Sequence, residues 1–126
     1  VYLYYNGSYK LYTWTGGVQV SGSLTASGDV TAYSDERLKS DIKTIDNAMD
    51  KVNQLRGVSY VKDDKQSIGV IAQEIETVLP EVVSDDGEYK SVAYGNIVGV
   101  LIEAIKEQQA QIDDLKNQVI KLQAYE

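Results

Sequence analysis

Apolar and polar positions alternate strictly over residues 18–32. Every even position in this range is apolar or glycine, and every odd position is Gln, Ser, Thr or Asp. Strict alternation is the pattern of a β-strand, and here a glycine recurs every six residues, at Gly22 and Gly28. One such strand has an apolar face that its own chain leaves uncovered. We therefore expect three copies to wind around one axis as a triple-stranded β-helix-like stem; the alternative is a single edge strand packed on the downstream domain.

An aromatic segment precedes this repeat. Its Asn6-Gly7 pair lies between alternating apolar residues, which is a strong signal for a β-hairpin. The rings of this segment either pack within strands or bind a sugar chain by stacking. They belong to Tyr2, Tyr4, Tyr5, Tyr9, Tyr12 and Trp14.

After Tyr33 the pattern becomes that of a small α+β domain. Each element is bounded by a residue that ends regular structure, such as Gly57 or Pro80. The predicted elements are a helix that carries Ile45, Met49, Val52 and Leu55, strands at 58–61 and 67–71, a short helix over 73–79, and a hairpin from Glu81 to Tyr89 that turns at 85–87.

The last predicted element is a helix from about Tyr94 to Leu122, about 43 Å long at 1.5 Å per residue. Its apolar positions alternate by three and four residues, which is the heptad spacing of a coiled coil. The alternative is a long amphipathic helix that lies on its own domain, although such a helix usually has a wider apolar stripe. The seam consists of Val98, Leu101, Ile105, Gln108, Ile112, Leu115, Val119 and Leu122.

The sequence gives two opposing indications of the number of helices in this coiled coil. β-branched residues in one seam position and Leu in the other favour a dimer, and Gln108 fixes the register at a cost in stability. The upstream repeat favours three chains instead. We expect a homotrimer.

Charge separates the two parts of the chain. Residues 1–33 contain only Lys10 and Asp29 as charged side chains, so the net charge of −7 lies in residues 34–126. This acidic balance argues against nucleic acid as a partner, because phosphate contacts require clustered Lys and Arg.

Composition excludes several kinds of site. The 126 residues contain no Cys and no His, which removes disulfides, thiolate metal sites and His-based catalysis, and we expect no metal and no cofactor. No apolar run approaches the roughly 18 residues of a membrane span. The chain starts at Val1, and we expect it to be a fragment of a longer protein.

The candidate chemistry lies at Ser34 and Lys39. A Ser-Lys pair is an alternative to Ser-His-Asp, but the lysine acts as a base only when it is neutral, which requires burial or a nearby cation such as Arg37. Five positions place the two residues about 140° apart on a helix and on opposite faces of a strand. They therefore meet only through a turn or across a subunit boundary. The alternative is a surface lysine beside a helix-capping Ser34 or Asp35.

The segment from Ser34 to Ile42 resembles the S-D-x-R-x-K-x-x-I start of the auto-cleaving intramolecular chaperones that end phage tail spikes, tail fibres, neck appendages and endosialidases. Residues 69–75 and 79–83 resemble the central G-φ-φ-A-Q-E-φ and L-P-E-φ-V segments of that family. Residues 94–97 and 101–106 resemble its closing helix. The resemblance runs from Ser34 to about Leu122, and no motif position departs from the pattern.

The resemblance implies a homotrimeric chaperone, residues 34–126, that templates the β stem of residues 1–33 and then cuts itself off. The cut falls between Tyr33 and Ser34. Ser34 matches the nucleophile and Lys39 the general base, while Asp35 and Arg37 match motif positions with orienting or tuning roles. The protein would be a serine peptidase that acts once, on itself, when the assembled trimer completes the active geometry.

The partners implied are other copies of the chain, the upstream stem and a host-surface polysaccharide for the fibre part. The fibre part is expected in the virion, and the chaperone part in the host cytoplasm during assembly. The alternative function is a non-cleaving trimeric fibre tip that binds a receptor. A eukaryotic membrane-tethered transcription factor with the same module is disfavoured by the fibre-like repeat.

Overall fold

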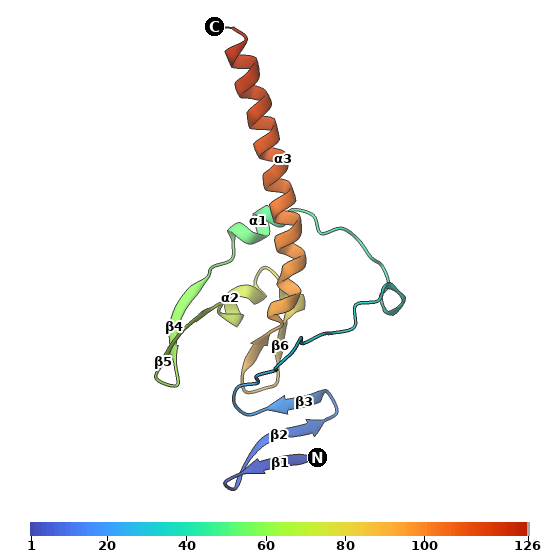
Figure 1. The fold of residues 1–126 in the computed structure, drawn as a ribbon, viewed down its shortest axis with the longest axis vertical. Helices are drawn as coiled ribbons and strands as arrows, with labels where there is room; N and C mark the ends of the chain where they lie inside the picture. Colours follow the sequence, from blue (N-terminus) through green and yellow to red (C-terminus); the bar gives the residue numbers. More distant parts are fainter. Residues whose placement is uncertain (126) are drawn as a thin grey trace. The chain divides into compact units, whose positions relative to one another are not determined.

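The computed structural model describes residues 1–125, and the chain divides into two compact units, Val1–Asp41 and a second that begins at Ile42 (Figure 1). The class is α+β, as predicted, with small antiparallel sheets and a long C-terminal helix. The boundary that the sequence predicts, at Tyr33–Ser34, is a cleavage site and not the border between the two compact units. It stays a prediction.

The first unit contains a three-stranded antiparallel sheet of β1 (Tyr2–Tyr5), β2 (Ser8–Trp14) and β3 (Gly17–Val20), in that order. The predicted hairpin at Asn6-Gly7 is confirmed, because both residues have positive φ and connect β1 to β2. Tyr2 lies opposite Tyr12, and their rings stack at 5.6 Å between centroids.

The alternating segment does not continue as a strand beyond Val20 in a single chain. Residues 21–35 have no regular structure, and the side chains of Leu24 and Val30 are 72% and 79% exposed. An isolated strand has no partner for its backbone N–H and C=O groups, so a lone chain gains little by adopting one. Within residues 1–125, the part of the alternating segment that joins a sheet is Val18–Val20, in β3, and residues 21–32 belong to no sheet. The alternative of an edge strand packed on the downstream domain stays untested. The three-chain stem stays a prediction.

The second unit contains the elements that the sequence predicts. The short helix α2 ends earlier than expected, because the chain passes into a turn before Pro80. The elements are α1 (Ala48–Asn53), β4 (Val58–Lys62), β5 (Lys65–Gly69), α2 (Ala72–Glu76), β6 (Val83–Asp85), β7 (Lys90–Val92) and α3 (Val98–Gln123), with 3₁₀ turns at Pro80–Val82 and Tyr94–Ile97. Each pair β4–β5 and β6–β7 forms an antiparallel hairpin.

A small apolar core joins α3, α1 and α2. Ile75 of α2 is fully buried, and Val100 and Ala104 lie one turn apart on the side of α3 that packs in this core. The buried apolar residues are Ala48, Ile75, Leu79, Val82, Val100 and Ala104. The core of the second unit is therefore assembled within one chain.

A carboxylate on α3 caps α1. The residue before α1, Asn47, has a left-handed backbone and makes no side-chain capping bond. Instead, the two oxygens of Glu107 accept hydrogen bonds from the backbone N–H groups of Ala48 and Met49, at 2.9 and 2.8 Å. These bonds satisfy donors that the helix leaves unpaired at its start. They lower the pKa of Glu107.

The first glycine of the G-φ-φ-A-Q-E-φ segment has a packing reason. A Cβ atom on Gly69 would lie 2.6 Å from the hydroxyl oxygen of Tyr94, which is closer than real contacts allow. That hydroxyl accepts a hydrogen bond from the backbone N–H of Val70 at 3.2 Å. A side chain at position 69 would displace this hydroxyl, which ties the 3₁₀ turn before α3 to the residue after β5.

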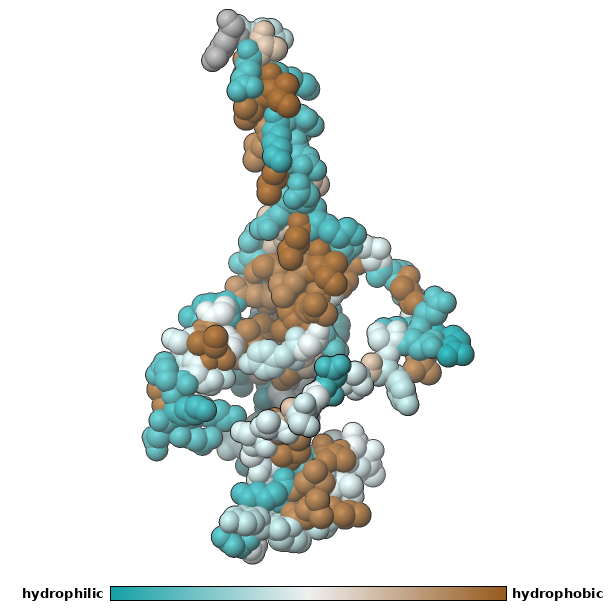
Figure 2. Space-filling model, in the orientation of Figure 1, coloured by the Kyte–Doolittle hydropathy of each residue, from teal (hydrophilic) through white to brown (hydrophobic). Residues whose placement is uncertain are grey.

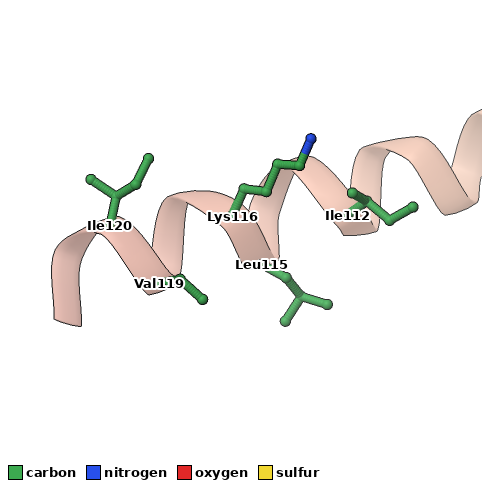
Figure 3. A pocket seen from close by; sticks show the side chains of 5 residues that line it. All are labelled: Ile112, Leu115, Lys116, Val119 and Ile120. Atoms are coloured by element: carbon green, nitrogen blue, oxygen red, sulfur yellow. The ribbon is translucent and has the colours of Figure 1, made fainter. Parts of the chain in front are cut away.

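Beyond Gln108, α3 leaves its own core. All eight predicted seam residues are exposed, and no residue from 108 to 125 is buried (Figure 2). Leu115 and Val119 point to one side of the helix, while Lys116 and Ile120 point to the other (Figure 3). The alternative prediction, a helix that lies on its own domain, therefore holds only for the first part of α3, where Val100 and Ala104 are buried. The coiled coil stays a prediction.

Candidate cleavage site

The predicted site residues lie together in a tight turn of the first unit. Asp35 is the N-cap of the 3₁₀ helix Glu36–Leu38, and its Oδ1 accepts a hydrogen bond from the backbone N–H of Arg37 at 2.9 Å. The turn is closed by Leu38 N–H to Asp35 C=O and by Lys39 N–H to Glu36 C=O, each at 3.0 Å. The interpretation of Asp35 as a helix cap is confirmed.

This turn brings the candidate nucleophile and base into contact. The Nζ of Lys39 donates a hydrogen bond to the Oγ of Ser34 at 2.6 Å. Of the two routes that the spacing allows, the structure uses the turn within one chain. The expectation that the contact forms only in the assembled trimer is therefore not needed for the geometry of this pair.

The other two predicted residues pair with each other. The Nε and Nη2 of Arg37 donate to Oδ1 and Oδ2 of Asp35 at 3.0 and 2.8 Å, a bidentate charge-assisted arrangement. The Arg37 bonds lower the pKa of Asp35, and the carboxylate raises the pKa of Arg37. The guanidinium group of Arg37 contacts Asp35. The expected tuning of Lys39 by Arg37 is therefore not supported by a direct contact between these two side chains.

The peptide bond before Ser34 is open to its surroundings. The Tyr33 side chain is 96% exposed, and the neighbouring residues line two shallow hollows. One hollow is lined by Thr31, Ala32, Tyr33 and Ser34, and the other by Tyr33, Asp35, Arg37 and Leu38. Ser34 and Lys39 are also exposed. A solvated ammonium group donates hydrogen bonds, and it acts as a base only after burial favours its neutral form.

Other kinds of site are not indicated. Among residues 1–125, no cluster of three or more His, Cys, Asp or Glu side chains is arranged to hold a metal ion. In the same range no helix has the length and apolar character needed to cross a membrane.

Glu107 is the structural residue that the sequence reasoning missed. It lies three residues after Ala104 and continues the core-facing side of α3, where a carboxylate is unexpected. That position was the available signal, because a carboxylate on a core-facing stripe requires a hydrogen-bonding partner.

The family comparison assigns this turn to the start of a peptidase-like domain. Residues 34–84 match the model of a peptidase family described as chaperone of endosialidase, and the match begins at Ser34 itself. The chain therefore carries a domain of the chaperone-of-endosialidase family, as its motifs predict.

The particular relatives are phage fibre proteins. The chain is 30% identical over 128 residues to the long tail fiber protein Gp37 of Enterobacteria phage T2, covering 92% of this chain and 10% of that protein. It is 36% identical over 101 residues to Gp37 of Enterobacteria phage Ox2, covering 70% of this chain and 40% of that protein. The chain thus spans a tenth of the T2 fibre protein and less than half of the Ox2 protein.

A relative outside the phages matches over a similar share. The myelin regulatory factor homolog 1 of Caenorhabditis elegans is 31% identical over 114 residues, covering 79% of this chain and 12% of that protein. The matched share of that protein is again a small part of its length.

Proposed function

We propose that residues 34–126 are an intramolecular chaperone that trimerises, templates the folding of a phage fibre or appendage stem, and releases itself by cleavage between Tyr33 and Ser34. The observation that carries this proposal is the 2.6 Å contact between Lys39 Nζ and Ser34 Oγ, at the residue where the family match begins. The phage tail fibre relatives support the same role.

The proposed reaction is an acyl shift followed by hydrolysis. Neutral Lys39 takes the proton of the Ser34 hydroxyl, and the oxygen attacks the carbonyl carbon of Tyr33. The peptide C–N bond breaks, the Ser34 nitrogen leaves as an amine after protonation, and an ester joins Tyr33 to the Ser34 oxygen. Water then hydrolyses the ester and leaves a Tyr33 carboxylate and a free Ser34. Because nucleophile and carbonyl belong to adjacent residues, the first step gains from positioning.

Assembly supplies what the single chain lacks. The contact is already made in one chain, but both side chains are exposed, and an exposed ammonium is a poor base. Burial of the turn by neighbouring protomers would favour neutral Lys39. In this proposal, cleavage reports the completed trimer through desolvation rather than through the meeting of the two groups.

The exposed seam of α3 is the proposed trimerisation element. Its heptad spacing and the exposure of Leu101, Ile112 and Leu115 support self-association, since an apolar stripe along a helix that stands clear of its core is stabilised by burial. Local helices associate faster than strands from three chains find their register, so the coiled coil gathers the stem strands. After release, the stem is held by a high unfolding barrier.

The location follows from this role. The released part, which includes residues 1–33, is proposed to remain in the virion, and the chaperone part acts in the host cytoplasm during assembly. Host-surface polysaccharide is the proposed ligand of the fibre part, supported by the exposed rings of Tyr2, Tyr4 and Tyr9.

Freshly expressed chain on a denaturing gel tests the proposal. We expect a fragment whose N-terminal residue is Ser34, and we expect Ser34→Ala to abolish it. Ser40→Ala, six residues further on, is the matched control and should cleave like the wild type. Wild-type chain that stays intact as a trimer after prolonged incubation would favour the non-cleaving, receptor-binding fibre tip instead.

A further inference from the structure

We propose that Asp35 is a positioning residue for the cleavage reaction: its carboxylate folds the turn that holds Ser34 against Lys39, and Arg37 locks that carboxylate in place. This inference rests on the proposed self-cleavage and assigns one role to two motif residues. Asp35 is not proposed to touch the reacting atoms.

The turn shortens the distance between Ser34 and Lys39. In an extended chain, five residues separate the Cα atoms of Ser34 and Lys39 by about 17 Å. A lysine side chain spans roughly 6 Å, a general estimate from bond lengths. The 2.6 Å contact therefore depends on the 3₁₀ turn between them. The two backbone bonds that close this turn are accepted by the C=O groups of Asp35 and Glu36.

The side chain of Asp35 stabilises the turn. Its Oδ1 accepts the backbone N–H of Arg37, one of the donors that the short helix leaves without a backbone partner at its start. Without that acceptor the turn competes with the extended conformations of a solvated peptide. A 3₁₀ helix of three residues has little cooperativity of its own to resist them.

Arg37 fixes the orientation of the Asp35 carboxylate. Its side chain is 86% exposed and that of Asp35 is 41% exposed, so water screens the ion pair and its direct contribution to stability is small. Its geometric effect is larger, because two parallel N–H···O bonds select one orientation of the carboxylate. In that orientation Oδ1 faces the backbone N–H of Arg37.

The expected effects follow from these contacts. Asp35→Ala removes the cap and the pairing, and we expect the first-order cleavage rate to fall by about tenfold or more. Asp35→Asn keeps a capping oxygen of similar strength, and we expect the rate to stay within about threefold of the wild type. Arg37→Gln keeps the cap and, like Asp35→Asn, loses the bidentate pairing, so we expect a similarly small loss. Glu36→Ala, an exposed neighbour in the same turn, should leave the rate unchanged.

The experiment uses the full chain. Cleavage is followed by gel and intact mass from about pH 6 to about pH 10, and the native mass of each variant is measured in the Ser34→Ala background. The charged groups of this segment are Asp35, Glu36, Arg37, Lys39 and Asp41. If Asp35 acts by positioning the turn, Asp35→Asn changes the plateau rate by no more than about threefold and leaves the pH of half-maximal rate unchanged. Asp35→Ala lowers the plateau rate and also leaves that pH unchanged.

Three results would overturn this inference. Asp35→Ala that cleaves like the wild type removes the positioning role. Asp35→Asn that is as slow as Asp35→Ala, or that shifts the pH of half-maximal rate, assigns the effect to charge instead. Wild-type chain that never cleaves overturns the proposed function together with this inference, so the two failures are distinguishable.

Discussion

The amine of Lys39 donates to the hydroxyl of Ser34 at 2.6 Å, across a turn that is closed within a single chain. Neither a helix nor a strand would place these residues together. The pair is therefore a product of the Asp35 cap and the short 3₁₀ helix, and its chemistry is open to direct tests.

Replacing Lys39 with alanine should stop cleavage without dissociating the proposed trimer. Loss of a general base typically costs about 10² to 10⁴ in rate, and Lys39 lies outside the core of the second unit. The rate is measured by gel and the oligomeric state by sedimentation. Lys43→Ala, four residues along, is the control. An unchanged rate in Lys39→Ala would remove this residue from the reaction.

A charge in the exposed seam of α3 should weaken self-association. Leu115 is 59% exposed in one chain, and three copies of a buried glutamate at this position would repel one another. We expect Leu115→Glu to shift the native mass from trimer to monomer at micromolar concentrations. Asn117→Glu, on the opposite side of the helix, is the matched control and should stay trimeric. A trimer in both variants would exclude this stripe as the interface.

Truncation of Ile75 should destabilise the second unit. The side chain is fully buried between α2 and the rest of the core, so Ile75→Ala leaves a cavity and is expected to cost about 2–5 kcal/mol of unfolding free energy. Denaturant unfolding of the Ser34→Ala chain measures this cost without cleavage. Ile68→Ala, at a residue that is 80% exposed, should change the free energy by less than about 0.5 kcal/mol.

Glu107 should make stability depend on pH in the acidic range. Its pKa is lowered by the hydrogen bonds from Met49 and Ala48, with a smaller effect of Lys51. Because the folded pKa lies below the unfolded one, the stabilisation is present above the unfolded pKa and is lost as the pH falls through the folded pKa. Thermal unfolding of wild type and Glu107→Gln should therefore differ at neutral pH and converge in acid.

The control for this titration is Glu88→Gln, which replaces an exposed carboxylate on the β6–β7 turn. It should follow the wild type across the whole pH range. A gap between wild type and Glu107→Gln that stays constant into strong acid would show that the carboxylate charge does not hold the cap.

The sequence predicted those parts of the fold that are set by neighbouring residues. Asn6-Gly7 specifies its hairpin by backbone preference, and the stop before Pro80 follows from the proline ring. The cap of α1 was beyond such reasoning, because Glu107 and Ala48 are 59 positions apart and meet only after α3 has packed. Residues 21–32 carry a strand pattern that one chain does not realise, since no strand of this chain pairs with them.

The candidate site was predicted as a set of residues but not as an arrangement. The motif names Ser34, Asp35, Arg37 and Lys39, and spacing left open whether the pair meets by a turn or across subunits. The capping preference of Asp35 decides between these routes, and the sequence reasoning treated that preference as an alternative to the chemistry. In the structure, the cap and the Ser34–Lys39 contact occur together.

Helix α3 carries two apolar stripes, one already packed through Val100 and Ala104 and one left open through Leu101 and Ile105. Consecutive residues lie about 100° apart around a helix, so neither stripe competes with the other for the same side chains. The core of the second unit is thus complete before the chain encounters a neighbour. If three chains assemble as proposed, assembly is an encounter between folded second units, with a rate that rises with concentration. Dilution after synthesis would then delay the proposed self-cleavage without changing the folding of the second unit.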